Sequence, residues 1–304
     1  MRLPVRRCCE PRARARAAMA LSKLSGDEVG IVFGQLCNVF EPSIAVAFSS
    51  VSHELREPTQ ALRQQLRAEH EAVVRLCRRM GMRSCKKLRE ARTIRLLSFS
   101  VTELATLCTL GSLLPALEKL ELNRCGATGV QRLAAGLGAG ALPAVTYLAF
   151  WGMHADDAGV SALAAALNRG ALPQLETLRL VKTAIGDAEL KTLTPALRRL
   201  PALEHLDLMY NPLTDEGLAA FVAPPLPAGS PPPGGLARLK QLDLSYTEVT
   251  DAGCAILTAA LNSGALPAIE IVELFRIPAS AVARKAVRVA LAKASVRRGR
   301  GNPR

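Results

Sequence analysis

The residue types that most often carry catalysis or bind metals are dispersed along this chain of 304 residues. The four histidines, His53, His70, His154 and His205, fall in separate segments, and no HExxH, GxSxG or Walker-type phosphate loop is present. The eight cysteines form no CxxC pair and no cysteine–histidine group with zinc-ligand spacing. The sequence therefore predicts no catalytic centre, no metal site and no cofactor, and we do not expect an enzyme.

Aromatic residues with a polar group are, in contrast, concentrated in one part of the chain. The single tryptophan and the three tyrosines all lie between residues 147 and 246, in or just after short apolar stretches. Aromatic residues mixed with arginine are enriched at protein-binding hot spots. The residues that we expect on such a surface are Tyr147, Trp151, Arg179, Lys182, Asp207, Tyr210, Asp243 and Tyr246, with charged neighbours at Glu121, Arg124, Glu273 and Arg276.

A repeated phrase accounts for the spacing of these residues. GALP occurs at Gly140, Gly170 and Gly264, with a shortened RRLP at Arg198. An apolar core of the form LxxLxL follows each phrase, and a fixed period of about 30 residues indicates stacked repeats. The cores begin at Ile94, Leu117, Val145, Leu175, Leu203, Leu239 and Ile269, and the first and weakest consists of Ile94, Leu97 and Phe99.

Each repeat contains two patterns, which predict two kinds of element. The LxL core alternates as a half-buried strand does, whereas the stretch after it places apolar residues three and four apart, as a helix does. Thr214 and Thr250 precede acidic residues, which favours a helix start at both places. In GALP, the glycine closes a helix and the proline prevents its continuation.

The pattern LxxLxLxx(N/C/T), joined to helices at this period, resembles leucine-rich repeats of the ribonuclease-inhibitor subtype. The resemblance implies an α/β solenoid, a horseshoe of about seven strand–helix units over residues 93–277, with a protein partner on its concave face. Only Asn211 provides the family's usual asparagine, because Thr183, Thr247 and Met153 stand at the equivalent positions. A second implied function is that of a GTPase activator, because the Ran GTPase-activating protein has the same repeat subtype.

Residues 21–92 precede the repeats and show helical spacing. Their layout resembles an F-box, the helical motif that binds the Skp adaptor of a ubiquitin ligase. The resemblance implies a substrate receptor as an alternative function; a plain helical cap for the first repeat is the other interpretation. The positions that match the motif, and that it implies as adaptor contacts, are Leu24, Val32, Phe33, Leu36, Val51 and Leu55.

The formal charge of +13 is concentrated near the ends of the chain. Residues 1–20 hold six arginines and one acid, which resembles an organelle transit segment without its serines. Residues 278–304 predict a capping helix, with Val282, Ala286, Val289 and Ala290 facing the last repeat, and a basic tail from 295 that stays unfolded. Such tails bind nucleic acid weakly and without sequence preference, or carry a nuclear address.

Two further features complete the domain organisation. Residues 223–235 are rich in proline and interrupt the repeats, which predicts a stiff surface loop. No apolar run is long enough to cross a membrane, and no secretory signal is evident. We therefore expect a cytoplasmic protein, with a nuclear location as the alternative.

Overall fold

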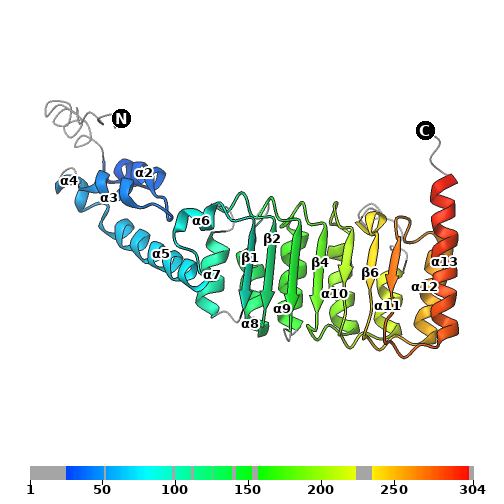
Figure 1. Ribbon diagram of the computed structural model, residues 1–304. Helices are drawn as coiled ribbons and strands as arrows, with labels where there is room; N and C mark the ends of the chain where they lie inside the picture. The colour runs from blue at the N-terminus through cyan, green and yellow to red at the C-terminus, as the bar shows by residue number, and fades with distance from the viewer. Residues whose placement is uncertain are drawn as a thin grey trace, which may run out of the picture. The chain divides into compact units, whose positions relative to one another are not determined.

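A computed structural model of the protein describes residues 25–50, 53–97, 100–110, 113–124, 126–138, 142–152, 157–223 and 235–300. The chain divides into two compact units, Met1–Leu88 and Arg89–Arg304 (Figure 1). The predicted Pro-rich loop, apart from its first and last residues, and the basic segment 1–20 lie outside the described residues.

The first unit is helical, as expected from the spacing of its apolar residues. Ser25 caps the first helix in a capping box with Glu28. Phe33, Ala45 and Leu66 form a small buried core that joins α2, α3 and α5. The helices are α2 (Gly26–Leu36), α3 (Ser43–Ser49), α4 (His53–Arg56), α5 (Gln60–Arg79) and α6 (Cys85–Arg89).

The second unit contains a parallel sheet of seven strands, whose order in space follows their order in the chain. Each strand is short and presents its core leucines to the interior. The predicted solenoid of strand–helix units is confirmed. The strands are β1 (Thr93–Leu97), β2 (Lys119–Asn123), β3 (Tyr147–Trp151), β4 (Thr177–Val181), β5 (His205–Asp207), β6 (Gln241–Asp243) and β7 (Ile271–Glu273).

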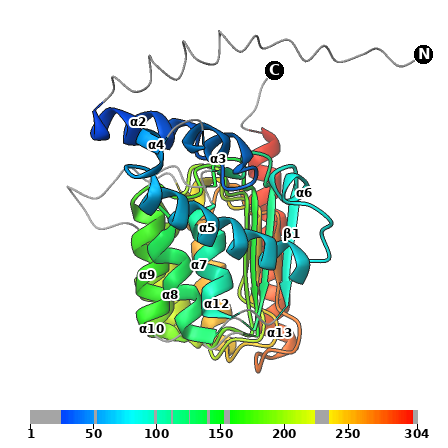
Figure 2. The same ribbon diagram turned by 90° about the vertical axis from the view of Figure 1, so that its left-hand side faces the viewer.

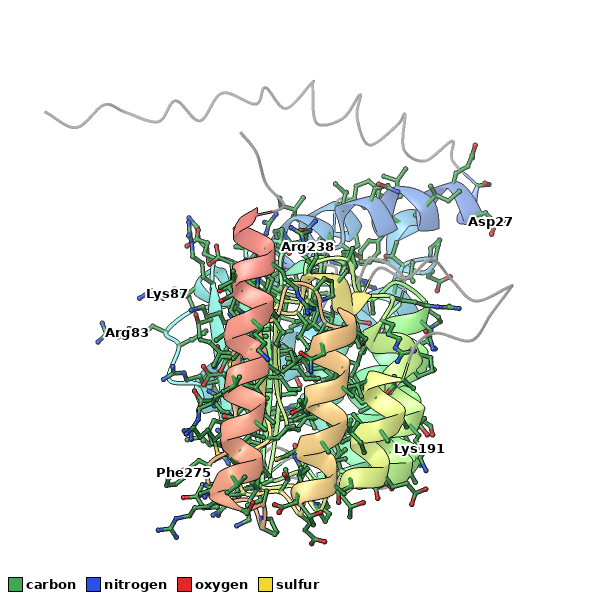
Figure 3. The ribbon with its side chains drawn as sticks, turned by 90° about the vertical axis from the view of Figure 1, so that its right-hand side faces the viewer. Asp27, Arg83, Lys87, Lys191, Arg238 and Phe275 are labelled. Carbon is green, nitrogen blue, oxygen red and sulfur yellow. The ribbon has the colours of Figure 1, made fainter. Side chains whose placement is uncertain are left out.

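The helices α7 to α12 of the second unit pack side by side on one face of this sheet, and none of them covers the other face (Figure 2). A short 3-10 helix, η2 (Gly235–Arg238), precedes β6. The last helix, α13, packs against α12 at the end of the solenoid (Figure 3). The helices are α7 (Val101–Thr109), α8 (Gly126–Gly136), α9 (Asp157–Asn168), α10 (Asp187–Leu197), α11 (Asp215–Val222), α12 (Asp251–Ser263) and α13 (Ala281–Arg300).

The strand register confirms the leucine alignment in all repeats except the first. Leu120, Leu148, Leu178, Leu206, Leu242 and Val272 lie at equivalent positions in β2 to β7. In β1, however, Ile94 pairs with Leu120 and Leu96 with Leu122, so the predicted register, in which Leu97 aligned with Leu120, is wrong, although Ile94 is buried as expected; Phe99 lies outside the described residues. Leu97 is 68% exposed. Two overlapping pairs of apolar residues, 94 with 96 and 97 with 99, satisfy the same alternation, and the sheet uses the first.

Asn211 connects two neighbouring repeats from a buried position. Its Oδ1 atom accepts hydrogen bonds from the backbone N–H groups of Thr183 and Ile185, both at 3.0 Å. Its Nδ2 group donates to the carbonyl oxygens of Leu180 at 2.6 Å and Leu208 at 2.8 Å. Thr247, at the equivalent position one repeat later, donates only to Leu244 within its own repeat. The side-chain hydrogen bonds between neighbouring repeats are therefore more numerous at Asn211 than at Thr247.

Hydrogen bonds between helix starts also link consecutive repeats. Thr214 and Thr250 cap α11 and α12 as predicted. Asp187 accepts hydrogen bonds from the backbone N–H of Thr214 at 2.9 Å and from its hydroxyl at 2.6 Å. Asp215 accepts the same two bonds from Thr250 at 2.8 and 2.5 Å. Each first-turn carboxylate thus fixes the cap of the next helix.

The C-terminal helix differs from the prediction in two ways. Of the four residues expected to face the last repeat, Ala290 is buried, whereas Val282, Ala286 and Val289 are exposed and Val287 is buried in their place. The helix also continues to Arg300, and the expected unfolded tail begins too early. Arg298 explains this extension, because its guanidinium donates to the carbonyl oxygen of Ile269 at 2.6 Å.

None of the helices within the described residues is long and apolar enough to cross a membrane.

Candidate protein-binding face

We call one surface of the second unit the strand face. It consists of the side of the sheet that the helices α7 to α12 do not cover and of the turn residue that lies two positions after the second core leucine of each strand. Alternation along each strand places every second side chain on this face. All eight residues predicted for a binding surface lie there. They occupy β3 (Tyr147, Trp151), β4 (Arg179) and the turn after it (Lys182), β5 (Asp207) and its turn (Tyr210), and β6 (Asp243) and its turn (Tyr246).

The turn after each strand has an unusual backbone conformation that repeats along the edge of the strand face. The residue two positions after the second core leucine has a positive φ, which side chains other than glycine rarely adopt. Such strain persists only where the surrounding structure enforces it. The residues are Arg124 (φ 52°), Gly152 (60°), Lys182 (53°), Tyr210 (59°), Tyr246 (57°) and Arg276 (50°).

Arg179 is the centre of a first cluster on the strand face. Its Nε and Nη2 atoms both lie 2.8 Å from Oδ2 of Asp207, in the neighbouring strand. The guanidinium carbon lies 4.9 Å from the centroid of the Trp151 ring, and Nη1 donates to the Tyr147 hydroxyl at 3.4 Å. Burial would lower the pKa of Arg179, but the bonds to Tyr147 and Asp207 raise it. Four predicted residues are therefore held in one arrangement.

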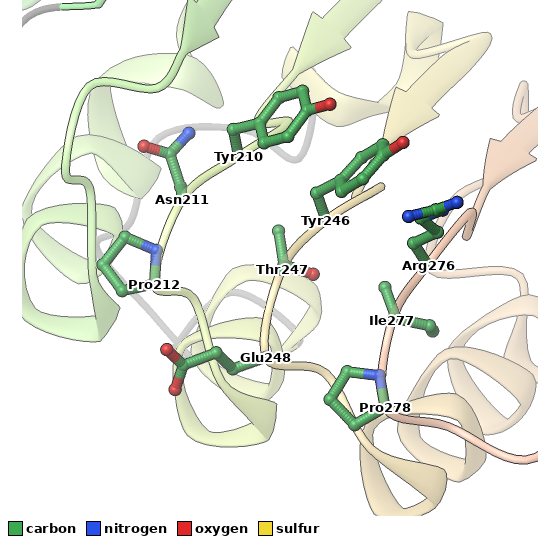
Figure 4. A pocket seen from close by; sticks show the side chains of 9 residues that line it. All are labelled: Tyr210, Asn211, Pro212, Tyr246, Thr247, Glu248, Arg276, Ile277 and Pro278. Carbon is green, nitrogen blue, oxygen red and sulfur yellow. The ribbon is translucent and has the colours of Figure 1, made fainter.

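A second cluster consists of aromatic rings at the other end of the face. Tyr210 and Tyr246 stack with their ring centroids 4.1 Å apart, and Phe275 meets Tyr246 edge-on at 5.6 Å. The Arg276 guanidinium lies 5.9 Å from the Tyr246 ring centroid. Below the rings is a shallow hollow of about 690 Å³, which Pro212, Thr247, Glu248 and Pro278 also line (Figure 4). This cluster is open to solvent, with Tyr210 46% and Phe275 57% exposed.

Phe275 was not predicted from the sequence. It occupies the position in the last repeat that corresponds to Trp151 in β3, one residue before the positive-φ position. Alignment of the last repeat with that of β3 could have identified Phe275 from the sequence, because the next residue, Arg276, is among the predicted charged neighbours.

Charge is distributed unevenly over the strand face. Toward β2 and β4, the exposed cations Arg124 and Lys182 project from the edge. Toward β6 and β7, Asp243 and Glu273 occupy neighbouring positions in the sheet, and neither forms an ion pair within 4.0 Å among the described residues. The face therefore carries the cations Arg124 and Lys182 toward β2 and β4, and the acids Asp243 and Glu273 together with the exposed cation Arg276 toward β6 and β7, with aromatic rings at both ends.

The F-box-like positions are placed differently. Phe33 and Leu55 are fully buried inside the first unit, and Leu36 packs against the same core as Phe33. Val32 is half-buried. Leu24 and Val51 lie outside the described residues. The described matches therefore contribute mainly to the interior of their own unit.

Within the described part of the chain, no group of three or more His, Cys, Asp or Glu side chains is arranged to hold a metal ion. The described cysteines Cys37, Cys77, Cys85 and Cys254 are free thiols. Burial raises the pKa of the Cys254 thiol, which disfavours its reactive thiolate form.

The seven parallel strands, each followed by a helix, define the class: the second unit is a leucine-rich-repeat solenoid. Consistent with this class, a family model described as leucine rich repeat matches residues 200–222 and 238–255. These are the repeats of β5 and β6, where the asparagine and the aspartate–threonine ladders are most regular. None of the curated proteins matches the chain.

Three solved structures are similar to parts of this chain. One, of actin-binding site 2 of leiomodin-1, is 14% identical with a TM-score of 0.35, over 47% of this chain and 75% of that one. The tropomodulin C-terminal domain of Caenorhabditis elegans is 17% identical with a TM-score of 0.39, over 67% and 100%. An internalin of Listeria monocytogenes is 13% identical with a TM-score of 0.34, over 64% of this chain and about half (51%) of its own.

Proposed function

We propose that the second unit is a non-enzymatic scaffold that binds a protein partner on its strand face. The observation that carries this proposal is the pair of aromatic clusters, in which Trp151, Tyr210 and Phe275 are exposed while their neighbours hold them in place. Trp, Tyr and Arg dominate the energetics of protein interfaces. Isolated exposed apolar residues are common on any protein, but here they share one face with Arg179 and Arg276.

The contacts within the clusters favour binding because they order the side chains beforehand. Immobilising a flexible side chain costs about 0.5–1.5 kcal/mol at an interface. The Tyr210 ring is already stacked on Tyr246, and Arg179 is already bound to Asp207 and Trp151. A partner would therefore meet a surface that needs little rearrangement.

The charge distribution indicates the kind of partner. Arg124 and Lys182 would favour acidic groups at one end, whereas Asp243 and Glu273 with the nearby Arg276 would contact groups of both signs at the other. A protein segment that is acidic at one end, carries mixed charges at the other and has apolar side chains between them fits this face. A uniformly charged polymer does not.

The two alternatives receive less support. Binding of a Skp-type adaptor through the F-box-like positions would require Phe33 and Leu55, which are buried, to become accessible. A Ran-type GTPase activator would need an arginine free to enter a partner's active site. Arg179 is engaged by Asp207 and Trp151, and no contact among the described residues distinguishes the exposed Arg124 or Arg276 as such a group.

The experiment compares partners captured from a native lysate by the full chain and by the double variant Trp151→Ala/Tyr210→Ala. We expect a captured partner to bind the double variant at least about thirtyfold more weakly, as truncation of hot-spot residues does. A matched control is Ile31→Ala/Val282→Ala, which removes two exposed apolar side chains that do not belong to the strand face. The proposal fails if the double variant keeps every partner with unchanged affinity.

A further inference from the structure

A second charged surface lies in the first unit. Residues 75–87, at the end of α5, in the following turn and at the start of α6, contain six cations and no acid. All six side chains are exposed. We call this segment the basic turn; its cations are Arg75, Arg78, Arg79, Arg83, Lys86 and Lys87.

Hydrogen bonds within the basic turn fix its backbone conformation. Gly81 has a φ of 69° and reverses the chain direction after α5. The N–H of Met82 donates to the carbonyl oxygen of Cys77 at 2.8 Å, which closes the helix end. Leu76 and Cys77 are buried. The apolar residues thus anchor the turn, and the cations remain on its outer side.

Helix electrostatics explain only part of this charge. Arg78 and Arg79 lie in the last turn of α5, where the negative end of the helix dipole favours cations. Lys86 and Lys87 lie at the start of α6, where the positive end disfavours them. Repulsion between six cations in one short segment adds to this cost. Local folding therefore does not account for the basic residues of the turn and α6.

Three of the six cations of the basic turn, Arg78, Arg83 and Lys87, have no acidic partner among the described residues. Arg75 lies 4.0 Å from Glu71, with both side chains largely exposed. For Arg78, Arg83 and Lys87, no carboxylate lies within ion-pair distance among the described residues. Arg83 and Lys87 reach outward on one side of this unit, whereas Asp27 lies on its opposite side (Figure 3). Arg83 and Lys87 therefore face solvent away from Asp27.

We propose that the basic turn binds the phosphodiester backbone of a double-stranded nucleic acid. Four of the six cations are arginines, whose planar guanidinium matches a phosphate group. The segment has no aromatic ring on which an unpaired base could stack, which favours a duplex over a single strand. A membrane surface is less well matched, because Leu76, the leucine of the turn, is buried and provides no apolar anchor.

Contacts between the basic turn and nucleic-acid phosphates predict that the binding affinity depends strongly on salt concentration and little on base sequence. Each phosphate contact contributes a slope of about −0.9 in a plot of log affinity against log salt concentration. About four contacts would weaken binding roughly a hundredfold between 50 and 200 mM salt. Sequence would have little influence, because the contacts would be to phosphates rather than to base edges.

The test measures fluorescence anisotropy of labelled 20-base-pair DNA and RNA duplexes titrated with the full chain. The variant Arg78→Gln/Arg83→Gln/Lys87→Gln should weaken binding by about tenfold or more at 50 mM salt and reduce the salt slope by about three. The control Lys285→Gln/Arg288→Gln/Lys293→Gln removes the same charge from exposed positions on α13. It should retain most of the affinity. Comparison of the two duplexes shows whether DNA or RNA is preferred.

Further measurements make the outcome decisive. The charge-conserving variant Arg83→Lys/Lys87→Arg should bind as the wild type does, and circular dichroism should show that every variant is folded. Equal loss of binding in the α13 control would assign the effect to overall charge or to the chain ends, and would overturn the proposal. Binding to vesicles with 30% phosphatidylserine but to neither duplex would overturn it in favour of a membrane surface.

Discussion

Tyr210 and Tyr246 occupy the same position in consecutive repeats, and their rings stack at a centroid distance of 4.1 Å with an interplanar angle of 18°. Both residues have positive φ values, so the backbone directs both rings to the same edge of the sheet. A hydrogen bond to the Tyr246 side chain is the main cause that raises the pKa of the Tyr210 hydroxyl. The repeat spacing of the sheet thus creates a contact that neither repeat has alone.

This contact can be detected by titration. In Tyr246→Phe, the ring is retained but the hydroxyl is lost, so the Tyr210 pKa should fall toward the usual value of about 10. Ultraviolet absorbance at alkaline pH follows tyrosine ionisation directly, and Tyr147→Phe serves as the control that leaves the pair intact. A Tyr210 titration that is the same in wild type and Tyr246→Phe would show that the hydroxyls do not interact.

Asn211 should contribute more to stability than its equivalents in other repeats. Asn211→Ala would remove the partner of two buried backbone N–H groups and of the Leu208 carbonyl oxygen, and each such group costs about 1–3 kcal/mol; the Leu180 carbonyl oxygen keeps a bond from the Thr183 hydroxyl. We expect the free energy of unfolding to fall by roughly 3 kcal/mol or more. Thr247→Val removes one bond within a single repeat and should cost about 1 kcal/mol. Urea denaturation compares the two; equal losses would contradict the inter-repeat role.

The fold of the second unit was predictable because leucine spacing determines the strand register. A slip by one residue would expose every core leucine, so the register from β2 to β7 left no alternative. The first repeat was ambiguous, since Ile94, Leu96, Leu97 and Phe99 fit two registers equally well. The face of α13 was also mistaken, because alanines and valines occur on several sides of that helix and provide no clear apolar stripe.

The candidate site was predictable in position but not in geometry. Alternation placed Tyr147, Arg179 and Asp207 on the strand face, but it could not show that their side chains meet. Those contacts depend on which residues of neighbouring strands are adjacent, and on the positive φ at Tyr210 and Tyr246. The ladder from Asp187 to Thr214 was also not foreseen, because it joins residues of different repeats.

Gly217 should be intolerant of a side chain for a reason that is specific to this ladder. A Cβ atom there would lie 2.6 Å from Cδ1 of Leu213 and 2.9 Å from the Cα atom of Asp187, and it would overlap the Asp187 carboxylate. Overpacking of this kind costs about 1–3 kcal/mol, although alanine is otherwise the better helix former. At Gly138, an added Cβ atom would meet nothing within 4 Å, so Gly138→Ala should change stability by less than about 1 kcal/mol. Thermal unfolding of the two variants measures the difference, and equal melting temperatures would contradict the close approach.

Asp187 should make the stability of the solenoid depend on pH in the acidic range. Burial raises the pKa of its carboxyl group, but hydrogen bonds from the Thr214 hydroxyl and from the backbone N–H groups of Thr214 and Gly217 outweigh this effect and lower it. Because the folded-state pKa lies below the unfolded value of about 3.9, the stabilisation is present above that value. It is lost as the pH falls through the folded-state pKa.

The prediction therefore concerns the difference in unfolding free energy between pH 5.5 and pH 3. Asp187→Asn should be less stable than the wild type at pH 5.5, and this difference should narrow at pH 3, because the carboxyl group of the unfolded chain is largely protonated there and the ionised form no longer favours the folded state fully. Thr214→Val removes the hydroxyl group that donates to Asp187. The unfolding free energy of this variant should therefore change less between pH 5.5 and pH 3 than that of the wild type. Urea denaturation at the two pH values provides the measurement. A gap that is equally large at both values would mean that the aspartate stabilises the helix start through packing, because protonation would then leave its contribution unchanged.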